Sequence, residues 1–285
     1  MITAFALALA TFAADTTVPA TKSQRLEIDA FAGSVIVRSW NRDAVKVEGA
    51  TGRRDNLEVE SRGGVVSVAT SGRYGVAGAA DLVVTVPIGM AVEVSGVELD
   101  VTIEGCRCAM RVETVQGDVV ASGGEGAATL TSVEGSVTVT GVNGKVQVNS
   151  VNDGITVRDV TGDVSAETIN GDVTLERIRG SNVEASTVNG DIAFDGEIRK
   201  GGSYGFTSHQ GDVRVAVPAN ADATIRVNTF NGSFESDFPV TLQGPTGRSK
   251  RLSFTLGAGG AAIDLESFSG DIRLLKPGAR PGNKN

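Results

Sequence analysis

The sequence predicts an all-β protein built as a parallel β-solenoid, a single rod in which short strands stack coil upon coil. A glycine-centred segment recurs every 18 residues along the middle of the chain, as from Gly117 to Gly135. Within each copy, apolar and polar residues alternate, which is the pattern of half-buried strands. Turn dipeptides such as Asn-Gly and Thr-Gly separate these strands. Because like residues keep one fixed register, equivalent positions are expected to form columns, which favours a solenoid over a β-sandwich.

The composition narrows the classes of fold and function. Glycine supplies 37 of the 285 residues, while apolar residues make up 40% and aromatic residues only 5%. Such a chain can bury a core, but a narrow one. The formal net charge is −8, whereas nucleic-acid-binding proteins usually carry a basic surface. The composition therefore argues against nucleic-acid binding. One histidine and two cysteines leave little material for zinc sites, histidine-based triads or a disulfide scaffold.

The chain is expected to divide into four parts. Residues 1–14 are apolar and small, which is typical of a secretory signal peptide, although no basic residue precedes them. The alternative for this segment is a buried strand or a short helix. Residues 15–98 are expected to form irregular strands that cap the rod, residues 99–276 its regular coils, and residues 277–285 a disordered tail. No segment reaches the ~18 uninterrupted apolar residues of a membrane-spanning helix.

In the N-terminal part, the glycine-centred segment occurs once, and after it the regular spacing is lost. The segment from Leu26 carries it, with Gly33 at its centre. Short antiparallel strands are then expected at 45–48, 57–60 and 65–69.

In the regular part, the repeat predicts nine successive coils from Leu99 to Gly270, a rod of about 43 Å at a strand spacing of roughly 4.8 Å. The central glycines are Gly117, Gly135, Gly171, Gly190, Gly211, Gly232 and Gly270, with Asp153 in the same place in one copy. The columns two before, two after and four after each glycine are predicted to point inward. The column two before holds Val115, Val133, Val151, Ile169, Val188, Phe230 and Phe268. His209 shares it, so we expect a packed histidine rather than a base.

The longest step between glycines contains extra residues near the C-terminus. The segment from Phe238 is predicted to be a hairpin that leaves the rod and covers the open strand edge at its end.

Aspartates that follow the glycines are the candidate metal ligands: Asp118, Asp172, Asp191, Asp212 and Asp271. Asp172, Asp191 and Asp212 lie on consecutive coils, where Ca²⁺ could relieve the repulsion between carboxylates about 5 Å apart. The sequence favours the alternative that these carboxylates accept hydrogen bonds from turn amides, because the calcium-binding motif Gly-Gly-x-Gly-x-Asp is absent. We therefore expect no cofactor, and Ca²⁺ is the one candidate ion.

Two further polar rows favour structural roles. The turn residues Asn152, Asn170, Asn189 and Asn231 are expected to stack as an amide ladder. A row of hydroxyl residues lies three positions before the glycines, near a corner: Thr114, Ser132, Ser150, Thr168, Thr187, Ser208, Thr229 and Ser267. An ice-binding surface needs a flat array of paired threonines, which a row at a corner does not provide.

No cluster typical of an enzyme emerges from the sequence. A β-helical polysaccharide lyase or hydrolase needs two carboxylates within ~5–10 Å in an aromatic cleft. Glu113 and Glu167 share a column but are three coils apart. Trp40, Tyr74 and Tyr204 are scattered.

Cys106 and Cys108 are two residues apart and are expected to face the same side of a strand. A pair of small buried thiols and a strained, reducible disulfide are both compatible with this spacing. The sequence therefore leaves their redox state open.

The order of several blocks resembles a known bacterial family. These blocks are VRSWNRDAVKVEG from Val37, VTVPIGMAVEVSGV from Val84, and serial glycine-aspartate strands that end in LESFSGDIRL from Leu265. Across nearly the whole chain after residue 14, they resemble the bacterial putative-adhesin family, an adhesin-like domain of unknown function. The resemblance implies an exported or envelope-facing β-solenoid, and it supplies no catalytic residues.

Together these observations predict an exported, non-catalytic binding or scaffold module of the periplasm, the cell envelope or the cell exterior. Its partner is expected to be an envelope or surface protein or a polysaccharide, with no nucleic acid and no membrane span. Two alternatives from other classes stay open: a polysaccharide lyase or hydrolase of β-helix type, and a structural protein of envelope-stress assembly.

Overall fold

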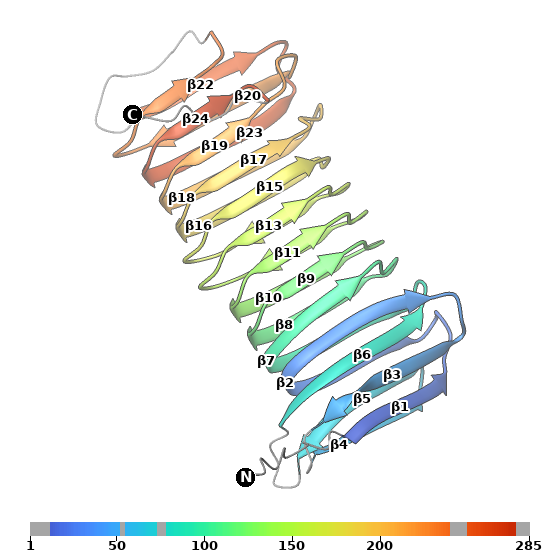
Figure 1. The fold of residues 1–285 in the computed structure, drawn as a ribbon. Helices are drawn as coiled ribbons and strands as arrows, with labels where there is room; N and C mark the ends of the chain where they lie inside the picture. The colour runs from blue at the N-terminus through green and yellow to red at the C-terminus, as the bar shows by residue number, and fades with distance from the viewer. Residues whose placement is uncertain (1–11, 52–54, 73–77, 240–249, 278–285) are drawn as a thin grey trace, which may run out of the picture.

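Stacked strands form a long rod in the computed structural model, which describes residues 12–51, 55–72, 78–239 and 250–277 (Figure 1). Parallel pairs make up the middle of the rod, and antiparallel pairs are added at its two ends. No helix occurs among the described residues. The chain is thus the all-β parallel solenoid that the repeat predicts.

Each regular coil contributes two short strands, one on either side of its glycine corner. The first strands are β8 (Met110–Gln116), β10 (Ala128–Glu134), β12 (Val146–Asn149), β14 (Val164–Glu167), β16 (Asn182–Asn189) and β18 (Ser203–Gln210). The second strands are β9 (Val119–Ser122), β11 (Val137–Thr140), β13 (Ile155–Arg158), β15 (Val173–Ile178), β17 (Ile192–Gly196) and β19 (Val213–Ala216). Residues one repeat apart pair in parallel register, as Leu130 does with Val148.

At the N-terminal end, two long strands run across both sides of a coil. These are β7 (Ala91–Glu104) and β2 (Arg25–Trp40), and Gly33 of β2 lies opposite Leu99 of β7. The copy of the frame around Gly33 therefore extends the regular stack.

Beyond β2, five shorter strands are stacked in succession and end the rod. They are β5 (Val65–Gly72), β6 (Ala79–Pro87), β4 (Asp55–Arg62), β3 (Ala44–Thr51) and β1 (Phe12–Pro19). Strands β5 and β6 pair in parallel with β2, whereas β4 pairs antiparallel with β5, β3 with β6 and β1 with β3. The antiparallel strands expected at 45–48, 57–60 and 65–69 are present. Most of the expected signal segment 1–14 lies outside the described residues, and its last three residues begin β1.

At the C-terminal end, the coils do not follow the order of the chain. Strands β20 (Ala223–Thr229) and β21 (Phe234–Ser236) form the outermost coil, and β22 (Lys250–Leu256) adds to β20 in antiparallel pairing. The chain then returns, and β23 (Ala261–Ser269) and β24 (Ile272–Leu275) enter the stack between β18–β19 and β20–β21. The expectation of nine coils in sequential order is wrong at this point.

The inserted coil has a physical reason. By entering between two coils, β23 pairs on both of its sides, with β18 and with β20. Strand β22 covers β20, as the hairpin expected from Phe238 requires, although residues 240–249 and the tail 278–285 lie outside the described residues. The edge of β20 is therefore paired rather than left open.

The core is a narrow column of aliphatic side chains between the two strands of each coil. The positions two and four after the glycines are buried as expected, and Val173 and Leu175, for example, have no exposed area. On the first strands, inward residues lie five and seven positions before the glycine, as Leu130 and Ala128 do. Inward residues therefore lie an odd number of positions before the glycine and an even number of positions after it.

The change of parity takes place at the corner, where most coils carry glycine. Gly135 has a φ of +145°, and a Cβ atom added to it would lie 2.1 Å from the carbonyl oxygen of Gly117 in the preceding coil. Only glycine allows the backbones of successive coils to approach so closely at this conformation. The repeat of glycine in the sequence thus records a steric requirement of coil stacking.

Candidate functional site

A continuous row of exposed apolar side chains runs along one edge of the rod, just before the glycine corners. We call it the edge row. In spatial order it comprises Phe31, Val97, Val115, Val133, Val151, Ile169, Val188, His209, Phe268 and Phe230. The exposed fractions of its large hydrophobic members range from 38% at Phe31 and Val97 to 46% at Ile169 and Phe230. Val133 and Val151 are partly exposed.

The edge row corrects the sequence analysis, which placed this column inside the core. If inward and outward residues alternated strictly through the corner, the residues two before the glycine would point inward, as those two and four after it do. The backbone changes its inward side there, so the residues three before the glycine are buried and those two before it are exposed. The outward position of the row makes it available to a partner.

At the C-terminal end of the edge row, three rings stack on one another. The ring centroids of His209 and Phe268 are 4.8 Å apart, and those of Phe268 and Phe230 are 5.0 Å apart with nearly parallel planes. His209 is exposed, so the expectation of a histidine packed in the core is wrong. The ring instead continues the row as an aromatic member.

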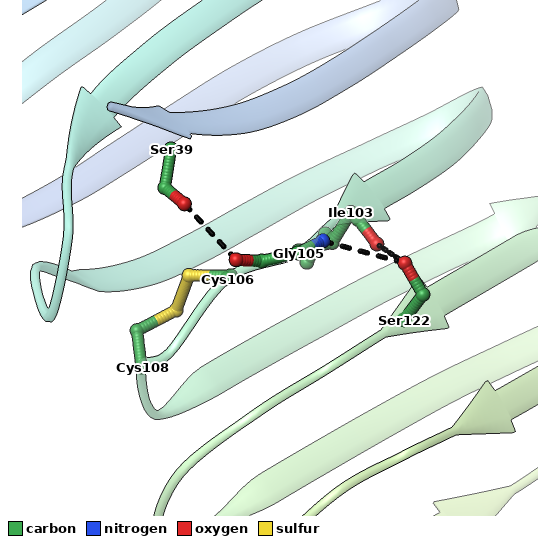
Figure 2. The surroundings of a disulfide bond; sticks show 6 residues. All are labelled: Ser39, Ile103, Gly105, Cys106, Cys108 and Ser122. Carbon is green, nitrogen blue, oxygen red and sulfur yellow. Dashed lines mark hydrogen bonds between the residues drawn. A yellow bond between two sulfur atoms is a disulfide. The ribbon is translucent and has the colours of Figure 1, made fainter. Parts of the chain in front are cut away.

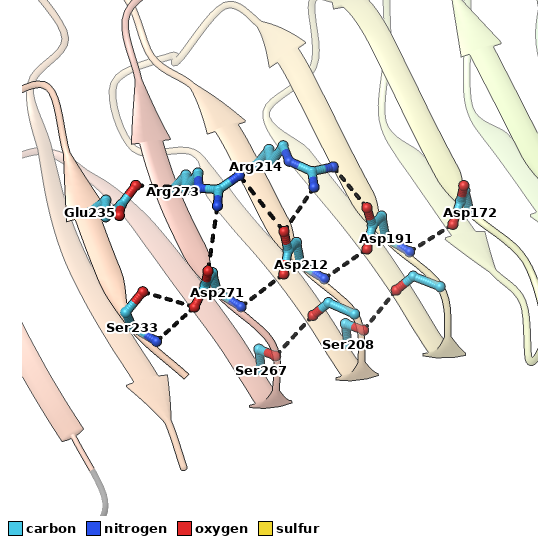
Figure 3. Close-up of polar contacts among 12 residues, drawn as sticks. Asp172, Asp191, Ser208, Asp212, Arg214, Ser233, Glu235, Ser267, Asp271 and Arg273 are labelled. Atoms are coloured by element: carbon cyan, nitrogen blue, oxygen red, sulfur yellow. Dashed lines mark hydrogen bonds and ion pairs between the residues drawn. The ribbon is translucent and has the colours of Figure 1, made fainter. Parts of the chain in front are cut away.

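The hydroxyl row predicted near a corner is buried inside it. In most coils the hydroxyl donates to the carbonyl oxygen at the glycine position of the preceding coil, as Ser132 does to Gly117 at 3.1 Å. Figure 3 shows the corresponding bonds of Ser208 and Ser267, at 2.9 and 3.0 Å. These residues fasten one coil to the next, and their burial excludes them as an ice-binding surface.

The aspartates proposed as calcium ligands form a ladder of backbone contacts (Figure 3). Asp172 accepts a hydrogen bond from the amide of Asp191, and Asp191 accepts one from the amide of Asp212, both at 2.8 Å. Asp212 in turn accepts from the amide of Asp271 at 2.9 Å. Each carboxylate therefore holds the amide at the equivalent corner of the next coil.

Arginines compensate the charge of this ladder. Arg214 donates to Asp191 and to Asp212 at 2.8 Å each, and Arg273 lies 3.8 Å from Asp212 (Figure 3). The guanidinium groups of Arg214 and Arg273 thus lie beside Asp191 and Asp212, where the calcium hypothesis would place the ion. Within the described ranges, no group of three or more histidine, cysteine, aspartate or glutamate residues is arranged to hold a metal.

An amide ladder runs beside part of the edge row. Asn170 donates to Asn152 at 3.1 Å, and Asn189 donates to Asn170 at 2.8 Å. The stacking predicted for Asn152, Asn170 and Asn189 is present, whereas Asn231, the fourth residue of the prediction, lies on the outermost coil and does not join the ladder. Their side-chain amides lie beside the edge row and form hydrogen bonds with one another.

The residues weighed for an enzyme do not converge. Glu113 and Glu167 lie on β8 and β14, which are separated by β10 and β12. The hydroxyl of Tyr204 is buried and donates to the carbonyl of Gly180 at 2.9 Å, while Trp40 donates to the carbonyl of Ala44 at 2.7 Å. Burial raises the pKa of Tyr204, which keeps the hydroxyl protonated as a donor. Tyr74 lies outside the described residues.

Cys106 and Cys108 form a disulfide bond at the corner between β7 and β8 (Figure 2). Both side chains are almost fully buried. The hydroxyl of Ser39 donates a hydrogen bond to the carbonyl oxygen of the flanking Gly105 at 3.0 Å. The amide of Gly105 donates to the hydroxyl of Ser122. Of the two possibilities open from the sequence, the structure contains the bridge.

No helix in the described part of the chain is long and apolar enough to cross a membrane. No curated protein shows significant sequence similarity to the chain. Solved structures with a similar fold include a putative adhesin from Bacteroides fragilis NCTC 9343, with a TM-score of 0.47 and 12% identity over 93% of this chain and 98% of that one. A putative lipid binding protein from Parabacteroides distasonis ATCC 8503 has a TM-score of 0.47 and 10% identity over 93% of this chain and 97% of that one.

The family model gives a match over almost the whole chain. It spans residues 7–275, which include every strand of the rod. The repeat, the stacked coils and this match agree with the adhesin-like resemblance found in the sequence. The chain belongs to the Toastrack DUF4097 family.

Proposed function

We propose that the protein is an exported, non-catalytic binding module of the bacterial cell envelope or surface, and that it holds its partner lengthwise along the edge row. The exposed row is the observation that carries this proposal. Single exposed apolar side chains are ordinary on soluble proteins, whereas contiguous ones mark interaction sites. With ten members at a strand spacing of roughly 4.8 Å, the row extends over about 43 Å.

Charge argues against a second copy of this chain as the occupant. The formal net charge is −8, and acidic side chains lie next to the row, among them Glu98, Glu134, Asp118 and Asp172. Two rods that pair through the same edge would bring these groups together, which is unfavourable. An extended protein segment or a polysaccharide is therefore the better partner.

Export is supported by the redox chemistry of the fold. Disulfide bonds persist in oxidising compartments and are rare in the cytosol. The Cys106–Cys108 bridge suits such a compartment, as does the apolar segment at residues 1–14. Cell fractionation with mass spectrometry of the N-terminus tests the cellular location. An uncleaved protein confined to the cytosol would contradict the proposal of export.

Co-sedimentation of the purified protein with isolated bacterial envelopes tests the edge row. The double variant Val115→Ser and Ile169→Ser removes two exposed members, and it should weaken envelope binding while leaving the melting temperature nearly unchanged. The matched control is Val120→Ser with Ile88→Ser, which changes two similarly exposed residues outside the row. Equal envelope binding by both double variants would refute the role of the row.

A further inference from the structure

A polar depression lies on the outer face of the first strands, away from the edge row. It has a volume of about 540 Å³, within the ~300–1,000 Å³ range of small-molecule sites. Residues from four successive coils line it, at the beginning of strands β12, β14, β16 and β18. The depression is thus built on paired strands, which hold its walls at fixed positions.

Gly205, near the beginning of β18, lines this depression without a side chain. The equivalent outward position carries Glu184 in the preceding coil and Asp264 in the following one. A Cβ atom at Gly205 would meet nothing within 4 Å, and its φ lies outside the left-handed region. Neither close packing nor backbone conformation requires glycine here, although glycine weakens a strand. A glycine inside a strand often marks a bulge, a bend or a place where a ligand approaches the backbone, and the unshifted register of β18 with both neighbours argues against a bulge here.

The walls present hydrogen-bonding groups of several kinds. Asp163 accepts from the backbone amide and the side-chain amide of Asn182, at 3.0 Å each, and these bonds hold the pKa of Asp163 below its ordinary value. Within the described chain, the side chains of Glu184 and Ser165 have no hydrogen bond or ion pair. Their polar atoms are therefore available to a ligand.

The lining selects the class of ligand. One ammonium group, from Lys145, and two carboxylates, from Asp163 and Glu184, leave the depression slightly negative, which disfavours an anion. No aromatic ring lines it, so a ligand would be held by hydrogen bonds rather than by ring stacking. Carboxylate, amide, hydroxyl and ammonium groups together match a ligand that carries many hydroxyl groups and no net charge.

We propose that this depression binds a neutral saccharide, as a unit of a surface polysaccharide. The inference rests on the proposed function in one respect, because it names the partner class of an exported binding module. Glu184 and Ser165 would hydrogen-bond sugar hydroxyls, and the bare backbone at Gly205 leaves room for the ring. Binding of a rigid polysaccharide here would extend the contact of the rod beyond its edge row.

Titration calorimetry with cello-, xylo- and chito-oligosaccharides tests the site on the full chain. The variant Gly205→Gln fills the depression, and it should weaken binding of the recognised oligosaccharide by about tenfold or more, since each lost hydrogen bond to a charged group accounts for about that factor. Its melting temperature should stay close to that of the wild type, because a Cβ atom at this position meets nothing within 4 Å and the backbone there does not require glycine. Thr138→Gln, an outward position on the second strand of a coil, is the matched control and should bind as the wild type does.

Three outcomes would overturn the inference. They are the absence of binding to any of these neutral oligosaccharides, binding of charged polygalacturonate alone, and equal affinities of Gly205→Gln and the wild type. If oligosaccharides fail to bind while envelope binding still depends on Val115 and Ile169, the saccharide site is refuted and the edge row stands. If oligosaccharides bind in a Gly205-dependent way while the edge-row variants bind envelopes normally, the saccharide site is supported and the edge row is refuted.

Discussion

Replacing Gly135 by alanine tests whether coil stacking depends on close approach at the glycine corner. The new methyl group would lie 2.1 Å from the carbonyl oxygen of Gly117, and the residue would be held at a φ of +145°. That carbonyl also accepts the buried hydroxyl of Ser132 at 3.1 Å, so moving it away leaves the hydroxyl without its acceptor. Backbone strain and the lost acceptor each cost about 1–3 kcal/mol, so the free energy of unfolding should fall by about 2–6 kcal/mol.

Urea unfolding followed by circular dichroism measures this loss, and Gly205→Ala is the control. At Gly205 a methyl group meets nothing, and the strand gains a better residue than glycine. The control should therefore be neutral or more stable by up to about 1 kcal/mol. Equal urea midpoints for Gly135→Ala and Gly205→Ala would refute the steric explanation of the repeat.

Three further predictions address the core, the acid limit and the disulfide. Val173→Asp places a carboxylate in the core and should cost about 3 kcal/mol or more, whereas Thr174→Asp on the outer face should leave the melting temperature nearly unchanged. The lowered pKa of Asp163 gives stability that is present above its unfolded-state pKa and is lost as the pH falls through the folded-state value. Asp163→Asn should therefore flatten the acid limb of melting temperature against pH, and an unchanged limb would contradict this. Reducing the Cys106–Cys108 bridge should lower stability by only about 1–2 kcal/mol, because so short a loop restricts the unfolded chain little; melting with and without dithiothreitol checks it, and a loss of the fold would contradict it.

The repeating part of the fold could be predicted because one coil resembles the next. Residues 18 positions apart pair in register from β8 to β15, as their spacing predicts, and the columns after the glycines are buried. The amide ladder from Asn152 to Asn189 follows from the same register. Each of these features depends on local spacing alone, which the sequence contains.

The edge row and the order of the last coils could not be predicted in this way. Alternation assigns the side of a residue correctly only while the strand is regular, and the corner at Gly135 changes the inward side. Phe268 and Val188 were therefore placed in the core although they are exposed. The signal that could have revealed the change is the hydroxyl row, because an invariably small polar residue beside a corner suits a buried bond to a carbonyl.

The coil order depends on contacts between distant parts of the chain. Strand β23 pairs with β18, although β20 and β22 come between them in the sequence. No local spacing distinguishes a coil added at the end from one inserted a layer deeper. Such long-range pairing can be recognised only from the assembled sheet.

The insertion of β23–β24 affects how the rod comes apart. In an ordinary repeat protein the last unit made is also the outermost one, so unravelling begins at a chain terminus. Here the last strands made, β23 and β24, lie one coil inside the end of the stack, and each pairs on both of its sides. Detaching these two strands from the chain's C-terminal side therefore breaks two ladders of backbone hydrogen bonds at once, whereas detaching an outermost coil would break only one.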